Sequence, residues 1–402
     1  MNVLYVYNYY QNPGGEDEPF AAEAALLEAQ GHSVHRYSLH NDAIKGMNPL
    51  VLAGTLIWNS GAYEDIRRVV REQHIDVVHF HNTFPLISPA AYYAAKKEGA
   101  RVVHTLHNFR LACPNSFLSR EGRVCEDCVG KAIPWPGVVH ACYRDSRAQT
   151  AAVAAMVSAH RFAGTWRRQI DLYVALSDFA RDKFIQAGLP AERITVKPNF
   201  LDPDPGMGTG SGGYALFVGR LSTNKGVEVL MRAWESVGTR LPLRIVGDGP
   251  LAERVQHLAT IGDAIDYLGR QPRERVLSLM REATVLVFPS VWYEGFPMTI
   301  VEAYASGLPV VASNLGSMAS IVRHGLTGLH FTAGDAEDLA AKIRWLCDNP
   351  SALQTFRTNA RLEYTGNYSA TQNYTQLMRI YNNVIKSTGG LSGAAAQEQY
   401  DA

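Results

Sequence analysis

Short runs of β-branched and aromatic residues alternate with longer amphipathic segments along nearly all of the 402 residues of the chain. This alternation is typical of parallel β-strands joined by right-handed helical crossovers. The expected strands begin at Val3, Ser33, Val77, Arg101, Leu172 and Ile194 in the first half, and at Tyr214, Leu243, Ile265, Thr284, Leu308 and Thr327 in the second. The pattern therefore predicts an α/β protein with two doubly wound sheets.

A stretch rich in proline and glycine, residues 202–213, separates the two halves and suits an exposed linker. We expect an N-terminal domain over 1–201, a second domain over 214–367, a C-terminal helix over 368–386 that packs back on the first domain, and a flexible tail over 387–402. The carboxyl ends of the strands of two such sheets would face each other, so the substrate site is expected between the domains.

The composition excludes several classes of function. Charged residues make up 19% and hydrophobic residues 47% of the chain, as in ordinary globular proteins. The 38 Lys and Arg residues balance the 38 Asp and Glu residues, so no overall charge attracts nucleic acid or anionic lipid. We find no apolar run long enough to cross a membrane and no secretory signal, so we expect a cytoplasmic protein without a nucleic-acid partner.

The segment Gly219–Gly226 follows the first strand of the second half and carries Arg220 and Lys225 before a helix. A guanidinium, an ammonium and the free N–H groups of a helix N-terminus together can bind an anion such as a diphosphate. The alternative is a solvated basic turn that only caps a helix.

A second motif lies after the expected strand that begins at Thr284. Glu294 precedes and Glu302 follows Pro297, a residue that suits the start of a helix. Both carboxylates could then accept hydrogen bonds from sugar hydroxyls in the cleft. The alternative is that two glutamates simply favour a helix N-terminus, which leaves the Gly-Phe-Pro turn unexplained.

These motifs together resemble the GT-B glycosyltransferases, and specifically the retaining, nucleotide-sugar-dependent enzymes of family 4. The resemblance rests on the Glu-x7-Glu spacing, the Gly-Arg-Leu-x3-Lys-Gly run and the Gly-Leu-Pro-Val-Val-Ala-Ser run from Gly307, and it covers essentially the whole chain. It implies that Arg220 and Lys225 hold the donor diphosphate, that Glu302 binds the ribose and that Glu294 binds the transferred sugar. Further donor contacts are expected from Gly15, Gly247, Gly269, Gly295, Phe296, Pro297, Met298 and Thr299. No metal is expected to assist catalysis.

The acceptor side is expected in the first half, where a Gly-Gly pair precedes Glu16 and Asp17. Backbone can approach a ligand closely at Gly15, and the two carboxylates could meet acceptor hydroxyls; a plain tight turn is the alternative. His107 matches the family's histidine near the transferred sugar, which implies orientation and charge stabilisation. Further acceptor contacts are expected from His81, Asn108 and Arg110. The histidines of these two strand ends either bind a metal or, as we prefer, satisfy neighbouring polar groups.

Four of the five cysteines, namely Cys113, Cys125, Cys128 and Cys142, lie in an insert at about 108–143. Two of them have the C-x-x-C spacing, so a structural zinc site, free thiols and a redox pair all remain open. Cys347 is expected in the core. The insert is similar to that of a bacterial subset of the family.

The sequence thus predicts a retaining hexosyltransferase that uses a UDP- or GDP-sugar and a glycan or lipid-linked saccharide acceptor, as in bacterial polysaccharide synthesis. A basic and aromatic segment with Arg161, Trp166, Arg167 and Arg168 could contact a membrane peripherally or be merely solvated. A sugar-nucleotide epimerase or hydrolase and a catalytically silent nucleotide-sugar binder are the alternatives. Replacing Lys225 by alanine is expected to abolish donor binding and leave the melting temperature unchanged.

Overall fold

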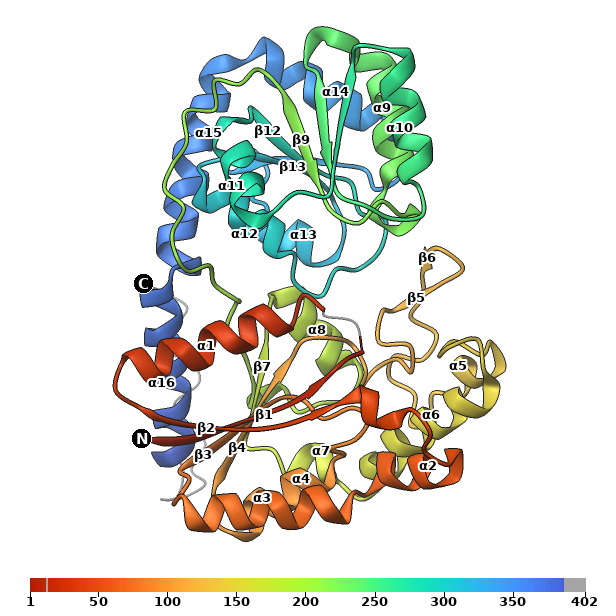
Figure 1. Ribbon diagram of the computed structural model, residues 1–402, viewed down its shortest axis with the longest axis vertical. Coiled ribbons are helices and arrows are strands. Elements are labelled where there is room, and N and C mark those ends of the chain that lie inside the picture. Colours follow the sequence, from red (N-terminus) through yellow and green to blue (C-terminus); the bar gives the residue numbers. More distant parts are fainter. Residues whose placement is uncertain (12–13, 387–402) are drawn as a thin grey trace.

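The computed structural model describes residues 1–11 and 14–386 and contains two α/β domains stacked end to end (Figure 1). The expected tail over 387–402 lies outside the described residues. Each domain holds a six-stranded sheet in which every neighbouring pair of strands is parallel. The predicted fold class is confirmed.

The sheet of the first domain has the order β2-β1-β3-β4-β7-β8. Its strands are β1 (Asn2–Tyr9), β2 (Ser33–His40), β3 (Val77–Asn82), β4 (Arg101–Leu106), β7 (Leu172–Ala175) and β8 (Ile194–Val196). Its helices are α1 (Asp17–Ala29), α2 (Pro49–Ile57), α3 (Ser60–Glu72), α4 (Ala90–Lys97), α5 (Trp135–Val139), α6 (Arg147–Phe162), α7 (Thr165–Arg168) and α8 (Asp178–Gln186).

The sheet of the second domain has the order β11-β10-β9-β12-β13-β14. Its strands are β9 (Ala215–Val218), β10 (Leu243–Val246), β11 (Ile265–Gly269), β12 (Val285–Phe288), β13 (Val310–Ser313) and β14 (Gly328–Phe331). The helices are α9 (Val227–Val237), α10 (Ala252–Ile261), α11 (Arg273–Glu282), α12 (Met298–Ala305), α13 (Gly316–Ile321), α14 (Ala336–Asp348), α15 (Pro350–Glu363) and α16 (Ala370–Lys386).

The strand runs expected from the sequence are all strands in the structure. The central strands β1, β3, β12 and β13 are buried on both faces, as continuous apolar runs in parallel sheets require. Side chains at the residues before several helices accept their free N–H groups, for example Asn59 before α3 and Ser177 before α8. A two-stranded hairpin of β5 (Ser119–Arg120) and β6 (Arg123–Val124) in the cysteine insert was not expected.

The segment 202–213 is more than an exposed linker, because its backbone is bonded to the second domain. The N–H groups of Gly208, Gly210 and Gly212 donate to the carbonyls of Ser306, Arg281 and Glu282 at 3.0, 2.9 and 2.8 Å. A Cβ atom at Gly208 would overlap the backbone of Arg281. Glycine is therefore needed here so that two backbones can approach closely.

The chain crosses between the domains a second time where α15 passes into α16, visible as the blue helices in Figure 1. At this crossing Leu201 pairs with Ser369, and the Tyr364 hydroxyl donates to the Leu201 carbonyl at 3.1 Å. The apolar face of α16, with Leu377, Tyr381 and Val384, then packs against α1 and the first sheet. The C-terminal helix thus closes the core of the N-terminal domain.

Candidate active site

The candidate site lies where the carboxyl ends of the two sheets face each other. In the second sheet the strand order reverses between β9 and β12, and ligands of open parallel sheets bind at such a reversal. Arg220 follows β9 directly, and the loop from Pro289 to Pro297 follows β12. The topology therefore brings the two motifs predicted to bind the donor to one place.

Arg220 lines an open pocket of about 470 Å³ together with Gly219, Gly247, Asp248, Gly249, Arg270 and Gln271. The Arg220 side chain is exposed and forms no ion pair within the part of the chain that the structure describes. Its charge is therefore available to an anion that enters the pocket.

Lys225 does not stand free beside Arg220. Its Nζ atom lies 2.8 and 2.9 Å from the two carboxylate oxygens of Glu294. Glu294 also accepts hydrogen bonds from Ser290 and from Trp292 Nε1, the latter at 2.9 Å. Lys225, predicted to bind the diphosphate, and Glu294, predicted to bind the sugar, thus form an ion pair with each other. Glu294 is 8% exposed and would lose its counter-charge on removal of Lys225, which argues against the expectation of an unchanged melting temperature.

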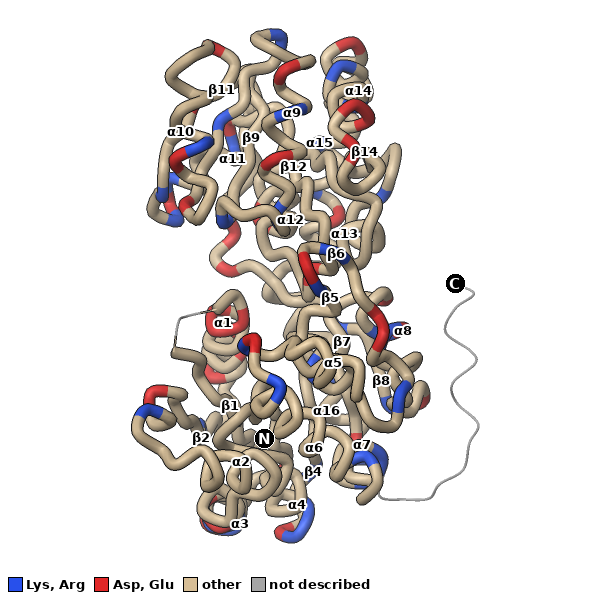
Figure 2. Tube along the Cα trace, turned by 90° about the vertical axis from the view of Figure 1, so that its right-hand side faces the viewer, with Lys and Arg blue, Asp and Glu red and all other residues tan. Residues whose placement is uncertain are grey.

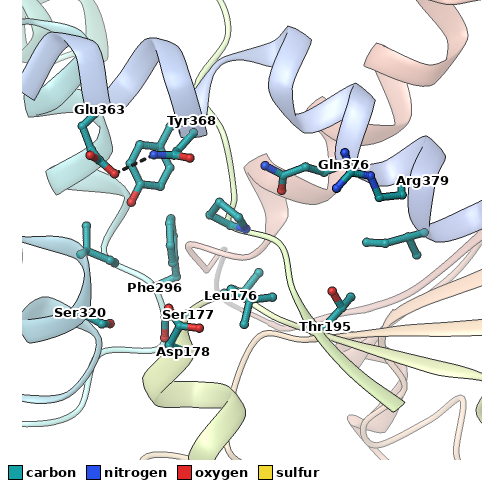
Figure 3. A pocket seen from close by; sticks show the side chains of 15 residues that line it. Leu176, Ser177, Asp178, Thr195, Phe296, Ser320, Glu363, Tyr368, Gln376 and Arg379 are labelled. Atoms are coloured by element: carbon teal, nitrogen blue, oxygen red, sulfur yellow. Dashed lines mark hydrogen bonds between the residues drawn. The ribbon is translucent and has the colours of Figure 1, made fainter. Parts of the chain in front are cut away.

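The loop before α12 contains the remaining predicted donor contacts. Pro297 precedes α12, whose first residues Met298 and Thr299 have N–H groups without a partner in the helix itself. A Cβ atom at Gly295 would lie 2.7 Å from the His107 carbonyl oxygen, so this loop touches the first domain closely. The Phe296 side chain points elsewhere, into a second hollow near the interdomain crossing that Tyr368 and Ser177 also line (Figure 3).

Glu302 lies in the second turn of α12, largely buried, with Arg273 Nη2 at 3.6 Å. Burial raises the pKa of Glu302 to about 7, which the charge of Arg273 partly opposes and that of Glu18 on α1 reinforces. Arg273 also pairs with Glu18, so the group that faces Glu302 links the two domains.

Gly247 and Gly269 were predicted to contact the nucleotide base through their backbones. Gly247 uses both of its backbone groups internally: its N–H donates to the Gly269 carbonyl at 2.9 Å, and its carbonyl accepts from the Tyr267 hydroxyl at 3.2 Å. Arg270 and Gln271, which line the same pocket, have polar side chains that sequence reasoning did not include.

In the first domain, the two carboxylates predicted in the loop after β1, Glu16 and Asp17, have different partners. Asp17 accepts from the Tyr7 hydroxyl at 2.7 Å and from the Gly14 N–H at 2.9 Å, so it stabilises the start of α1. Gly15 is exposed at this loop. Glu16 accepts from Asn108 Nδ2 at 3.0 Å, and its Oε2 atom is buried without a partner in the described chain. Burial raises the pKa of Glu16 to about 7, although Asn108 and Arg110 oppose the shift.

Arg110 is held by its own domain. Its Nη1 atom donates to the Pro114 carbonyl at 2.5 Å, and its guanidinium lies 4.1 Å from the centre of the Phe84 ring and 5.2 Å from that of Tyr143. The Arg110 Nε atom is buried and unpaired in the described structure. Arg110 therefore has one free donor, beside Glu16 and Asn108.

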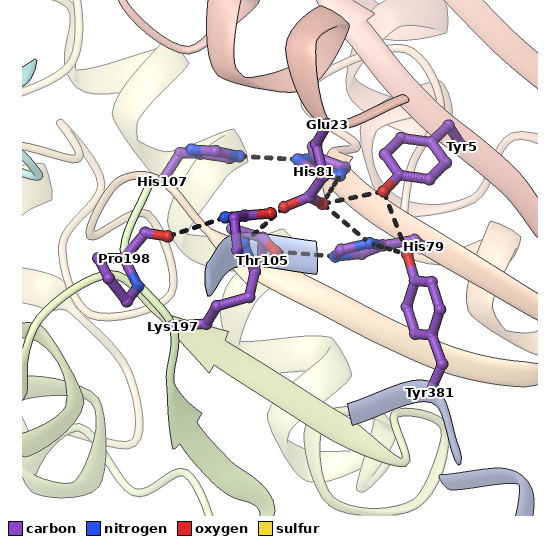
Figure 4. Close-up of polar contacts among 10 residues, drawn as sticks. Tyr5, Glu23, His79, His81, Thr105, His107, Lys197, Pro198 and Tyr381 are labelled. Carbon is purple, nitrogen blue, oxygen red and sulfur yellow. Dashed lines mark hydrogen bonds and ion pairs between the residues drawn. The ribbon is translucent and has the colours of Figure 1, made fainter. Parts of the chain in front are cut away.

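His107 and His81 form a buried pair, with 2.9 Å between His107 Nε2 and His81 Nδ1 (Figure 4). Burial lowers the pKa of His107 to about 4. A neutral His107 can orient a substrate, whereas charge stabilisation by this residue stays a prediction. The other nitrogen of His81 lies 3.7 Å from a Glu23 oxygen, which favours a proton on that nitrogen and makes His107 the donor within the pair.

Below this pair lies a buried ionic network that the sequence did not reveal (Figure 4). Lys197 Nζ lies 2.5 Å from Glu23, and the Tyr5 hydroxyl donates to Glu23 at 2.9 Å. Tyr381 on α16 contacts both Tyr5 and His79, at 3.1 and 2.7 Å. Burial alone would raise the pKa of Glu23, but Lys197 and its other partners outweigh burial and lower it.

Glu23, His79 and His81 have ligand atoms within 4.8 Å of one another, a spacing that suits a metal. The ammonium of Lys197 already supplies the positive charge that a cation would bring. The arrangement therefore favours the predicted polar role of these histidines over metal binding. In the sequence, the one signal of this network was Lys197, which follows β8, the last strand of the first sheet.

Comparison with known proteins agrees with this geometry. The sequence model described as Glycosyltransferase Family 4 matches residues 21–205, and the model described as Glycosyl transferases group 1 matches residues 210–363. Each matched segment contains most of one of the two sheets. The chain belongs to the family 4 glycosyltransferases.

Several curated proteins are similar to this family 4 chain. The uncharacterized glycosyltransferase MJ1178 of Methanocaldococcus jannaschii is 32% identical over 158 residues, which are 39% of this chain and 44% of that protein. The D-inositol 3-phosphate glycosyltransferase 1 of Catenulispora acidiphila is 27% identical over 340 residues, or 78% of this chain and 74% of that one. The aligned segment thus spans less than half the length of the first of these relatives.

Solved structures share the fold at lower identity. The HepE protein of Anabaena, in complex with UDP, superposes with a TM-score of 0.68 at 19% identity and covers 95% of this chain and 100% of its own. A glycosyltransferase from Rickettsia africae superposes with a TM-score of 0.71 at 17% identity, over 96% of this chain and 99% of its own. The GT-B architecture of this glycosyltransferase is therefore shown.

Replacing Lys197 by methionine should destabilise the protein by about 3–5 kcal/mol, because Glu23 would remain buried without its counter-charge. Unfolding followed by denaturant or heat measures the effect. The same substitution at Lys96, whose pair with Asp171 is 26% and 22% exposed, should cost about 1 kcal/mol or less. Equal costs for the two variants would contradict the importance of the buried pair.

The cost of removing Lys197 should also depend on pH. At acid pH the unpaired Glu23 of the variant is protonated and its burial is tolerated, whereas ionisation at higher pH makes burial costly. The difference in stability between wild type and variant should therefore widen as the pH rises through the range in which the Glu23 carboxyl ionises. A difference that does not depend on pH would contradict this account.

Proposed function

We propose that this glycosyltransferase moves a hexose from a nucleoside diphosphate sugar to a lipid-linked saccharide with retention of the anomeric configuration. The observation that carries the proposal is Arg220, without an ion pair in the described chain, in a 470 Å³ pocket at the reversal of the strand order, where the loop before α12 also follows its strand. UDP-glucose is the first donor to test, since the HepE protein of Anabaena has been solved with UDP and with UDP-glucose. A GDP-sugar is the second.

The proposed reaction relies on stabilising the leaving diphosphate. Arg220, Lys225 and the first N–H groups of α12 supply positive charge as the bond from the anomeric carbon to the phosphate oxygen breaks. The acceptor oxygen forms its bond on the same face of the sugar, and its proton passes to the departing phosphate oxygen. His107, neutral and fixed by His81, orients the sugar ring, and no divalent metal is required in this scheme.

Glu294 and Glu302 would bind the hydroxyls of the transferred sugar and of the ribose. Glu294 is already bonded to Lys225, so donor binding must replace part of these bonds. A phosphate oxygen would accept from the Lys225 ammonium, and a sugar hydroxyl would donate to Glu294. On the acceptor side, Glu16 Oε2 and Arg110 Nε are buried without a partner in the described chain, so these side chains would have to turn outward to bind the incoming saccharide.

An apolar groove supports a lipid-linked acceptor. It has a volume of about 430 Å³, lies between α2, α6 and the loop after β3, and includes Leu50, Ala53, Leu56, Phe84, Tyr143 and Val153. Phe84 also lines the small cavity beside His107, so the groove and this cavity share a wall next to the predicted reaction centre. A saccharide near His107 could thus leave its lipid tail in the groove.

The basic and aromatic segment that the sequence indicated is only partly exposed, because Arg167 and Arg168 are exposed whereas Arg161 is half-buried and Trp166 is buried. Trp166 is buried in the core, and the Arg161 guanidinium donates to the backbone carbonyls of Leu111 and Ala187. Exposed apolar side chains lie instead on α2 and around it, at Leu50, Val51, Ile57 and Trp58. Among the described residues, no helix combines the length and the apolar character that a membrane crossing requires. Any membrane contact of this surface would be peripheral.

Thermal unfolding with UDP, GDP and their sugars tests the donor site. A ligand present at about 100 times its dissociation constant adds about 2.7 kcal/mol to stability, and Arg220→Ala should abolish that shift. Arg254→Ala is the matched control, because Arg254 pairs with Glu228 away from the pocket and should leave the shift intact. A full shift in the Arg220 variant would contradict the assignment.

Transfer itself is followed with UDP-glucose and a lipid-linked saccharide, and the anomeric configuration of the product is read by NMR. Donor binding without any transfer would point to a silent binder. Turnover of the donor without an acceptor would point to an epimerase or a hydrolase.

Donor affinity should rise with pH because the pKa of Glu302 is raised to about 7. Ribose hydroxyls donate to the ionised carboxylate, so one pH unit below that pKa the affinity should be about tenfold weaker. UDP-glucose is the appropriate probe, since its diphosphate is esterified at both ends and does not titrate in this range. Calorimetry should show a flat profile for Glu302→Gln, and an unchanged slope in that variant would contradict the role of Glu302.

A charge in the apolar groove should impair acceptor use alone. Leu50 is 83% exposed, so Leu50→Asp should fold normally yet raise the KM for a lipid-linked acceptor about tenfold, the equivalent of about 1.4 kcal/mol of lost apolar contact. The thermal shift with UDP-glucose should not change. Leu362→Asp on α15, where the side chain is 62% exposed, is the control and should leave both measurements unchanged. A normal KM in the Leu50 variant would contradict the proposal that the lipid tail lies in the groove.

A further inference from the structure

The cysteine insert forms an arm, residues 108–145, that leaves the end of β4 and extends toward the second domain. Its β5–β6 hairpin lies at the level between the two domains in Figures 1 and 2. The arm is anchored in the core of the first domain by Phe109, Leu111 and Leu118, but Phe117, Ile133, Trp135 and Val139 on it are exposed. The outer part of the arm therefore buries little apolar surface and needs a further constraint to order it.

The backbone of the arm adopts conformations that need such a constraint. Six of its residues other than glycine have left-handed backbone angles, with φ between 50° and 70°. Residues of this kind rarely adopt that region, and it persists only where surrounding structure imposes it. The residues are Ser116, Leu118, Glu121, Ala141, Arg144 and Asp145.

Three of the four cysteines of the arm lie near Gly137. A Cβ atom at Gly137 would lie 3.0 Å from the ring of Pro114, which follows Cys113, and Cys125 lies three residues before Cys128. Gly137 connects two of them: its Cβ position would lie 3.5 Å from the Cys128 sulfur, and its carbonyl accepts from the Cys142 N–H at 3.0 Å. All four thiols are free of disulfide bonds.

Two of these thiols form hydrogen bonds that metal binding would replace. The Cys113 thiol donates to Asn115 Oδ1 at 3.0 Å, and the Cys128 thiol donates to the Pro134 carbonyl at 3.8 Å. Arg120 donates to Asp127, which lies between Cys125 and Cys128, at 2.8 Å. A guanidinium at this place would offset part of the negative charge of four thiolates.

We propose that Cys113, Cys125, Cys128 and Cys142 bind one zinc ion, which orders the arm. Four sulfur donors in a segment without its own core are the ligand set of a closed structural zinc site. Each thiol would lose its proton to solvent on binding, and no electron transfer is involved. No three of the sulfur atoms lie within 4.8 Å of one another in this structure, so binding would require the side chains to turn toward a common centre.

The zinc site would place the arm against the donor side of the cleft. Glu126, between Cys125 and Cys128, accepts from the Tyr293 hydroxyl at 2.7 Å and from Lys183 at 2.8 Å. Phe117 stacks on Trp292 with 5.1 Å between ring centres, and Trp292 in turn donates to Glu294. The ordered arm thus supports the loop that carries Glu294.

The metal content of the full-length wild type, purified without chelator, tests the proposal. Mass spectrometry of the metals should find about one zinc per chain. Removing that zinc with a strong chelator should lower the melting temperature, and zinc but not magnesium should restore it. Less than about 0.1 zinc per chain after incubation with zinc, or a disulfide among these cysteines by mass spectrometry, would overturn the proposal.

Cys125→Ser should lose the zinc, whereas Cys347→Ser should keep it, because Cys347 lies on α14 away from the arm. Full zinc content in the Cys125 variant would contradict the assigned ligand set. If the Cys125 variant does not fold, the chelation experiment on the wild type still decides. Glu126→Gln should retain zinc and bind UDP-glucose more weakly, which separates the metal site from its effect on the donor loop. Metal content does not depend on the proposed donor, so failure of one experiment leaves the other interpretable.

Discussion

In both sheets all neighbouring strands run parallel, so every functional loop must follow a strand at the same edge of its sheet. The two edges face each other, and this constraint assembles a site from segments that are far apart in sequence. Glu16 after β1, His107 after β4, Arg220 after β9 and Glu294 after β12 are placed at the facing edges in this way. The contact between Gly295 and the His107 carbonyl shows how closely the two edges approach.

The charges at these edges are satisfied to different degrees, and the differences suit different tasks. The Lys197–Glu23 pair is buried and held by further hydrogen bonds, so it fixes the shape of the first domain. Arg220 is exposed and unpaired within the described chain, so its charge is available to a ligand. Lys225 and Glu294 lie between these extremes, bonded to each other at the edge of the cleft.

Sequence patterns predicted the strands and both donor motifs because these depend on local periodicity and short spacings. The ionic network escaped prediction because Glu23 and Lys197 are 174 residues apart and meet only through the order of the strands. For the same reason the Lys225–Glu294 pair, 69 residues apart, was read as two separate ligand contacts. Trp166 looked like surface because no pattern in that short helix distinguishes a buried tryptophan from an exposed one. The glycines of 202–213 suggested flexibility, whereas they permit close backbone packing.

The contacts between the domains have a consequence for how the cleft can open. The chain crosses twice at one side, where Leu201 pairs with Ser369, and this side is suited to act as a hinge. Besides the crossing, the domains touch through the Ser177–Ser317 hydroxyls, through Gly295 and through the Glu126–Tyr293 bond of the arm. These second contacts involve the loop after β12 and the start of α13, next to the proposed sugar site. Opening the cleft must therefore break contacts of the same loop that carries Glu294, so the domain arrangement and the state of the donor loop are physically linked.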